Sequence, residues 1–237
     1  MEHQPLLRGH GLGRSIRATL SCSGERGRAL RMIGGHTSTG GESGLGTELE
    51  LQRRLSLVTP ADSVRGLSFH TAMEAVRADL GDEALAQCLA RNREKAYKSF
   101  FHYPVSEYLV LLYNAAWMLS EKHGGFDSAV RRISGGIAPS FLGSVVGKAF
   151  MLLAKEGPRQ LINNMPVAFR AAASFGEIIV QWSGPRSGML VTKRDFLLYL
   201  NHEGGLMGLF RAVGLPGARV SGRQVGTLDN VVEFSWE

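Results

Sequence analysis

Apolar residues recur at helical spacing over much of the chain before residue 176. The longest such stretch, APSFLGSVVGKAFMLLAKEG, covers Ala138–Gly157 and carries no charge before Lys148. Phe141, Val145 and Leu152 share one face, and further apolar residues widen that face on either side. Because a helix that is apolar over most of its circumference is a buried helix, this pattern predicts a central element wrapped by other elements.

Four further helices are predicted ahead of this stretch, from apolar residues three, four or seven positions apart. Their ranges are 62–80, 82–96, 104–122 and 126–134. Asp62 or Ser63 can cap the first, Asp82 can cap the second, and Pro104 suits the first turn of the third. Behind the central stretch, Gly157-Pro158 opens another helical segment, which Pro166 breaks or restarts.

The pattern changes to alternation after Gly176. Segments 177–183 and 188–193 are predicted to be strands joined by a turn, and 218–225 and 230–236 to be a closing hairpin. A helix is predicted over 204–213, while 196–200 either extends the sheet or starts a helix. The predicted fold class is therefore α+β, with N-terminal helices packed on a C-terminal antiparallel sheet of strand pair, helix and strand pair.

Residues 1–57 differ from the remainder of the chain. They hold eleven of the 30 glycines, interspersed with serine, threonine and arginine. Because this composition buries too little apolar surface to offset chain entropy, we expect a disordered tail over 1–57 and one α+β domain over 58–237. An alternative is that the natural chain starts at Met32, and that the residues before it result from a wrongly assigned gene boundary.

A few aromatic and small residues are the best candidates for contact with a ligand or partner. Tyr113 and Trp117 form an aromatic stripe at i, i+4, and Gly143 and Gly147 form a small-xxx-small pair that allows a close backbone approach. Such a stripe is usually part of a core, and such a pair most often indicates tight helix packing, within the chain or across a dimer. The complete predicted contact set is Tyr103, Tyr113, Trp117, Phe141, Gly143 and Gly147.

No constellation of residues indicates catalysis, a metal or a cofactor. None of the histidines beyond the tail has a second histidine at i+3 or i+4, and Cys88 falls on an apolar helix face. The GSVVGK stretch at Gly143–Lys148 has one residue too few between its glycines for a phosphate loop, and alanine follows the lysine. We therefore predict no catalytic residues, no cofactor and no metal site.

Charge and composition limit the class of partner. Lysine and arginine number 27 against 21 acidic residues, a net charge of +6, without a basic block in the folded region. This favours a protein partner, a second copy of the chain or a small apolar ligand over nucleic acid. Two cysteines and no long uncharged apolar run predict a cytoplasmic protein without a membrane span.

The order of several landmarks resembles a large paralogous family of uncharacterised proteins largely restricted to myxobacteria. These landmarks are the opening at 64–69, the Tyr-Pro at 103–104, the Phe-to-Gly-Lys pattern at 141–148, the Gly-Pro at 157–158 and the strand that ends in tryptophan. The resemblance covers about residues 62–237. It implies one self-contained module with a regulatory role and supplies no catalytic residues.

The order of elements is also loosely similar to 4-vinyl-reductase-type domains, their trafficking-complex relatives and heme-NO-binding domains. That resemblance implies an apolar ligand or a partner held between helices and sheet. The heme-binding form carries a Tyr-x-Ser-x-Arg motif, whereas Tyr103 is followed by Val105 and Glu107. We therefore expect a regulatory ligand- or partner-binding module without heme; the alternatives are a nucleic-acid-associated regulator and an enzyme whose site is assembled from distant residues.

Overall fold

The computed structural model describes residues 44–93, 96–143, 147–148 and 157–237. The first element is helix α1 (Glu48–Ser56), whose N-cap Thr47 accepts a hydrogen bond from the backbone of Glu50 at 3.1 Å. Leu51 is fully buried. The prediction of a disordered tail over 1–57 is thus corrected for residues 48–56, because Leu51 packs against later elements that the local composition does not reveal; residues 1–43 lie outside the described residues.

Helix α4 (Val105–His123) is deeply buried, with Leu109, Leu112 and Ala116 among its inaccessible side chains. The helices and turns that contact it include α1, α2 (Gly66–Leu80), α3 (Asp82–Cys88), η2 (Leu89–Arg91) and α5 (Phe126–Gly135). Together they enclose a first apolar cluster. A helix is confirmed in each predicted range of this region, but the one predicted over 82–96 ends at Cys88 and continues only as η2. Helix α4 occupies the central place expected for Ala138–Gly157.

Only part of that expected central helix can be compared with the prediction. Helix α6 (Ile137–Leu142) covers its start, and Gly147 and Lys148 are also helical, whereas 144–146 and 149–156 lie outside the described residues. Within α6, Ala138 is buried but Phe141 and Leu142 are only partly buried. The apolar pattern predicted a helix buried on all sides, whereas α6 keeps part of its surface accessible.

Two short strands precede helices α2 and α4. Strand β1 (Ser63–Arg65) pairs antiparallel with β2 (His102–Pro104), with Val64 opposite Tyr103. The sequence predicted a helix from about residue 62, but α2 begins only after β1. Three-residue strands are too short to show alternation, so this small sheet leaves no periodic signal.

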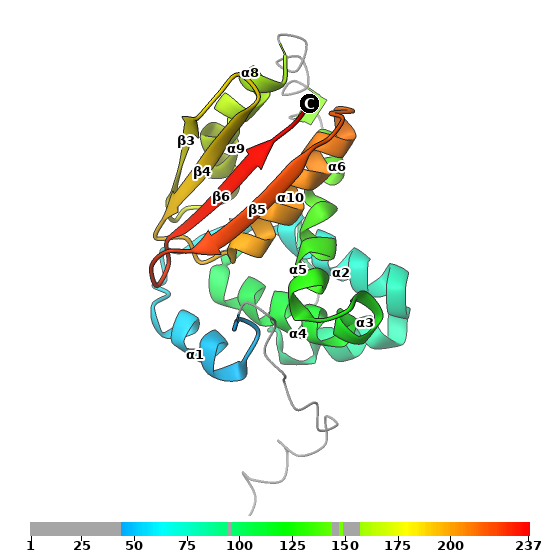
Figure 1. The fold of residues 1–237 in the computed structure, drawn as a ribbon. Helices are drawn as coiled ribbons and strands as arrows, with labels where there is room; N and C mark the ends of the chain where they lie inside the picture. Colours follow the sequence, from blue (N-terminus) through cyan, green and yellow to red (C-terminus); the bar gives the residue numbers. More distant parts are fainter. Residues whose placement is uncertain (1–43, 94–95, 144–146, 149–156) are drawn as a thin grey trace, which may run out of the picture. The chain divides into compact units, whose positions relative to one another are not determined.

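The C-terminal region forms the predicted antiparallel sheet (Figure 1). Its strands are β3 (Glu177–Trp182), β4 (Ser187–Lys193), β5 (Arg219–Gln224) and β6 (Asn230–Ser235), in the order β3-β4-β6-β5. Helix α10 (Tyr199–Ala212) covers one face of the sheet and contacts β5 and β6. A second apolar cluster, which includes Leu190, Leu206 and Val232, fills the space between them. The α+β class is confirmed.

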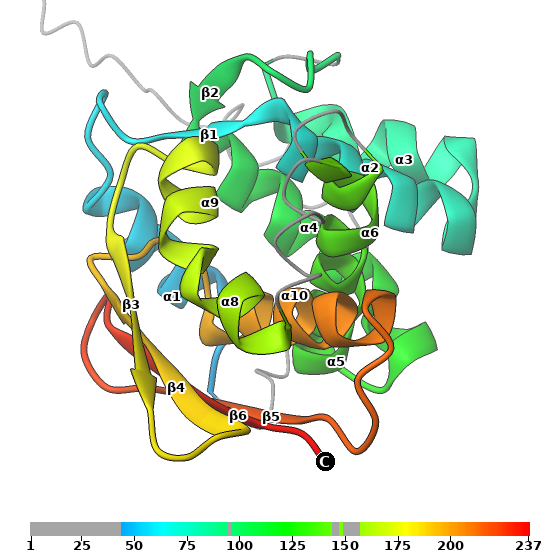
Figure 2. The same cartoon turned by 90° about the horizontal axis from the view of Figure 1, so that it is seen from above.

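Helices α8 (Pro158–Asn163) and α9 (Met165–Ala172) lie inside the curve of this sheet (Figure 2). Asn164 separates them, and its side-chain amide donates to the carbonyl of Gln160 at 2.8 Å. The break predicted at Pro166 therefore falls at the start of α9. A bridge between Val64 and Ala173 ties the end of α9 to the small sheet.

Helices α5 and α10 make the closest backbone approach seen between helices of the described chain. A Cβ atom on Gly204 would overlap the backbone of Arg131, and one on Gly208 would overlap the backbone of Gly135. The sequence predicts this kind of contact at Gly143 and Gly147. In the structure, a Cβ atom on Gly147 would overlap the carbonyl of Phe141 in α6, and the close helix–helix packing occurs at the glycines of α10.

Candidate functional site

Four rings form what we call the aromatic seam: Phe169, Phe175, Phe196 and His202. Like Tyr199, Phe169 on α9 packs against both apolar clusters. Its ring centroid lies 6.0 Å from that of Phe175 and 6.1 Å from that of His202, and Phe175 lies 5.2 Å from Phe196. The edge-to-face geometry of Phe175 with its two neighbours is the arrangement that ring quadrupoles favour. The seam thus joins α9, the segment after β4, and α10.

Helix α9, which carries Phe169, is itself only partly buried, whereas the other three rings of the seam are buried. Its sequence, MPVAFRAA, is apolar except for Arg170, yet none of its residues is buried in the described structure. Phe169 and Met165 are partly buried, and Val167 is 56% exposed. An apolar helix that keeps this much surface accessible is the feature most typical of a binding site in this part of the fold.

His202, one ring of the aromatic seam, forms a buried polar pair with Asp195. The Nε2 atom of His202 lies 2.6 Å from Oδ2 of Asp195, and both side chains are almost inaccessible. The other carboxylate oxygen of Asp195 accepts the backbone N–H of Leu197 at 2.9 Å. Since both carboxylate oxygens are engaged, Asp195 fixes the orientation of the His202 ring within an otherwise apolar surrounding.

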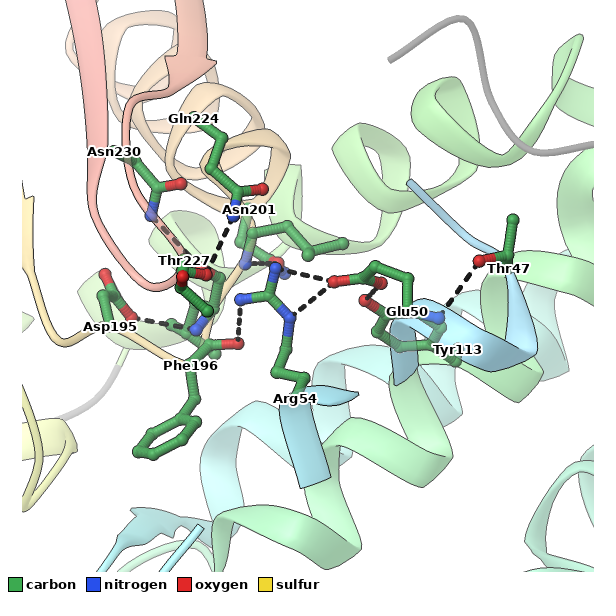
Figure 3. Close-up of polar contacts among 12 residues, drawn as sticks. Thr47, Glu50, Arg54, Tyr113, Asp195, Phe196, Asn201, Gln224, Thr227 and Asn230 are labelled. Carbon is green, nitrogen blue, oxygen red and sulfur yellow. Dashed lines mark hydrogen bonds and ion pairs between the residues drawn. The ribbon is translucent and has the colours of Figure 1, made fainter. Parts of the chain in front are cut away.

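A second polar network holds Phe196 from the side of α1 (Figure 3). The guanidinium of Arg54 donates to the carbonyl oxygen of Phe196 at 3.1 Å and to Glu50 at 2.8 Å. Glu50 also accepts the hydroxyl proton of Tyr113. Burial raises the pKa of the Tyr113 hydroxyl, so it stays a donor at neutral pH. This network links α1, α4 and the segment that follows β4.

A bidentate ion pair lies on the other side of the same segment. Arg194 donates to both carboxylate oxygens of Asp62, at 2.8 and 2.9 Å, and its guanidinium lies 5.2 Å from the Phe196 ring centroid. Hydrogen bonds from Arg194 lower the pKa of Asp62 to about 2, although burial acts in the opposite direction. Phe196 is therefore contacted by two arginines, Arg54 at its carbonyl oxygen and Arg194 at its ring.

The six residues predicted from the sequence do not form one site. Tyr113 is inaccessible, and Trp117 donates its indole N–H to the carbonyl of Gly46, so the aromatic stripe contacts the chain's own residues around α1. Tyr103 lies in β2, where its hydroxyl accepts the N–H of Lys98 at 2.8 Å. The remaining three, Phe141, Gly143 and Gly147, lie in and just after α6.

Sequence reasoning did not find the aromatic seam. The apolar pattern around Phe169 predicts only that a helix continues past Pro166, and the pairing of Asp195 with His202 joins a loop residue to one seven positions later. No periodic template places those two side chains together. A usable signal was the apolar character of α9 combined with the proline at its start, which marks a short, separately placed helix.

Within the described ranges, no three histidine, cysteine or acidic side chains gather as a metal site. Cys88 is buried, and burial raises the pKa of its thiol to about 12, which leaves it protonated and unreactive. No helix among these residues has the length and apolarity needed to cross a membrane.

The fold of this chain can be compared with the folds of solved structures. Solved H-NOX structures share it: the H-NOX protein from K. algicida in its Fe(II) unliganded state matches with a TM-score of 0.59 and 15% identity, covering 73% of this chain and 96% of that one. The H-NOX protein from S. oneidensis in the Fe(II)NO ligation state matches with a TM-score of 0.58 and 13% identity, covering 73% and 99%. At these identities the likeness shows an H-NOX-like fold.

The sequence itself belongs to the family described as protein of unknown function (DUF2378), whose profile matches residues 57–237. This confirms the resemblance to an uncharacterised family and extends the matched range to residue 57. The restriction of that family to myxobacteria stays a prediction. Comparison with curated protein sequences finds no significant match.

The H-NOX-like fold raises the question of whether the described residues fit a heme. An axial ligand needs a free histidine nitrogen, a thiolate or a comparable donor facing an apolar space. His202 is the one described histidine at the aromatic seam, and its Nε2 is held by Asp195. The others are engaged elsewhere: His70 with Tyr97 and Ser99, His102 with Ser63, and His123 with Asp79. The described residues therefore do not fit a heme.

Proposed function

We propose that this chain is a regulatory module that binds a small apolar ligand at the aromatic seam. The observation that carries the proposal is α9, an apolar helix beside the seam with no fully buried residue among those described. The H-NOX-like fold supports it, because the H-NOX protein from K. algicida is described in an unliganded state and that from S. oneidensis in an NO-ligated state.

The chemistry of the seam indicates the class of ligand. Phe169 and Met165 offer partly buried apolar surface, while the side chains of Asp195 and His202 are hydrogen-bonded to each other. A neutral ring or short acyl chain gains by covering that surface and does not require a compensating charge. Ligand binding acts by population shift, stabilising one position of α9 against α10 and the sheet.

The change in α9 would then be transmitted to a regulatory partner or to a second copy of the chain. Of the contact residues predicted from the sequence, this part of the proposal uses those that keep accessible surface, Tyr103, Trp117, Phe141 and Gly143, whereas Tyr113 and Gly147 are buried. Homodimerisation and a cytoplasmic location remain predictions of the same standing. The module is proposed to work by binding alone, without catalysis.

The test uses the full chain and the uncharged fluorescent probe Nile red. We expect saturable binding to the native protein, and we expect Phe169→Ser to weaken it at least about fivefold by removing a ring that contacts both clusters. Val167→Ser is the matched control, because Val167 lies on the same helix, is 56% exposed and belongs to neither cluster.

Thermal unfolding establishes that each variant is folded before its affinity is compared. If Phe169→Ser does not fold, Met165→Ser replaces it, since Met165 is only partly buried on the same helix. Equal affinities for Phe169→Ser and Val167→Ser, or no saturable binding to the native chain, would overturn the proposed site.

A further inference from the structure

Two adjacent phenylalanines project from the surface at some distance along the chain from the aromatic seam. Phe100 is 66% exposed and Phe101 is 60% exposed. They belong to the turn Lys98–Phe101, which leads directly into β2, at the rim of the fold and away from the four-stranded sheet (Figure 2). Large apolar side chains exposed side by side are typical of a surface that meets a partner or a membrane.

This turn is held in place by the backbone around it. Phe101 donates its N–H to the carbonyl of Lys98 at 3.1 Å and accepts the N–H of Gly66 at 2.9 Å, while Ser99 accepts that of Leu67 at 3.2 Å. A Cβ atom on Gly66 would overlap the carbonyl of Lys98, so the glycine allows the turn to lie directly on the start of α2. The exposure of the two phenylalanines is therefore built into the fold and is not a result of a loosely attached loop.

The turn itself carries one positive charge, that of Lys98, and the nearest arginines along the chain are each paired with a glutamate. The ammonium of Lys98 lies 5.3 Å from the Phe101 ring centroid, and Lys98 makes no ion pair with any described residue. The Arg93 side chain is 93% exposed, with Glu107 3.8 Å away, and Arg91 lies 3.4 Å from Glu48. No acidic residue occurs among the described positions from 91 to 102, and the charges of Glu94 and Lys95, outside the described residues, cancel.

We propose that the Lys98–Phe101 turn docks the protein on an anionic lipid surface. A turn with two exposed rings can enter the boundary between headgroups and acyl chains without a matching groove, while Lys98 remains level with the lipid phosphates. A cation near an anionic surface adds attraction that salt weakens. Two rings and one cation give weak, reversible association, which is the behaviour of a peripheral contact.

The test is flotation of the full chain with vesicles of phosphatidylcholine, alone or with about 30% phosphatidylserine, at low and high salt. We expect binding only to the anionic vesicles. The double variant Phe100→Ser/Phe101→Ser should lower the partition coefficient at least about fivefold, and Lys98→Ala should lower it by a smaller factor. Leu49→Ser is the matched apolar control, being 62% exposed on α1, and Arg211→Ala is the matched charge control.

Binding that is equal in the wild type and the phenylalanine double variant would overturn the proposal, because it would assign the attraction to net charge or to residues 1–43. Absence of binding to either vesicle would overturn it as well. Analytical ultracentrifugation of the same proteins supplies a third outcome: a dimer that the double variant abolishes would make a second copy of the chain the occupant of this surface. These results do not depend on the aromatic seam, so the two proposals can fail separately.

Discussion

Arg194 shows at the scale of one residue how a strained backbone is stabilised by charge. Its φ of 44° is in the left-handed region, which side chains other than glycine rarely adopt, and it is the one such non-glycine residue in the described ranges. Its backbone N–H donates to Asp229 at 3.0 Å, and its guanidinium holds Asp62. The Asp62 carboxylate is almost fully buried, so the pair joins the strand before α2 to the segment before α10.

The lowered pKa of Asp62 leads to a prediction about acid stability. The pKa is about 2 in the folded protein and 3.8 without the interaction, so folding is stabilised when the carboxylate is charged. We expect Asp62→Asn to lower the unfolding free energy by about 1–2 kcal/mol at pH 6, a value reduced for the half-exposed Arg194. The difference should shrink as the pH falls from about 4 towards 2, where the wild-type carboxylate becomes protonated.

Urea unfolding of both proteins across this pH range measures the effect. Glu233→Gln is a suitable control, because the Glu233–Arg223 pair is exposed on both sides and should change stability little. A stability difference between wild type and Asp62→Asn that does not vary with pH would show that the ion pair is not its cause.

At the scale of elements, the glycines of α10 determine how tightly it packs on α5. Gly204→Ala should destabilise the protein by about 1–3 kcal/mol, because the added Cβ atom overlaps the backbone of Arg131, which cannot move aside as a side chain can. The adjacent Gly205→Ala is the control: its Cβ atom would lie 4.0 Å from the carbonyl of Ser134. That substitution should be neutral or slightly stabilising, since alanine favours helix. Chemical unfolding of both variants checks this, and equal effects would contradict the packing.

The elements also show what the sequence could predict. The closing strand β6 was predicted from the alternation of Val232 and Phe234, which do point inward, because one of its faces is buried and the other is not. The start of α10 was left open between strand and helix. Its first turn contains Asn201 and Glu203, polar residues buried against Ser134 and Arg131 of α5, and the sequence alone does not reveal those partners. The polar parts of the candidate site depend on such long-range pairs.

At the scale of the whole molecule, an H-NOX-like fold occurs with residues that do not fit a heme. Hemin added to the full chain should therefore give no absorption band characteristic of histidine-ligated iron. His202→Ala tests this directly, because His202 is the described histidine nearest Phe169. We expect the wild type and His202→Ala to give the same Soret spectrum. A ligated band that is present in the wild type and lost in the variant would reverse the conclusion drawn from the Asp195–His202 pair.

The position of α1 has a consequence for where this protein can be divided. The family profile starts at residue 57, just after α1 ends. A chain shortened to the matched residues would leave the Phe196 carbonyl without Arg54 and would uncover Tyr113, which the longer chain keeps inaccessible. The residues that the family profile matches are therefore fewer than the residues needed to cover the core, because the matched part lacks α1.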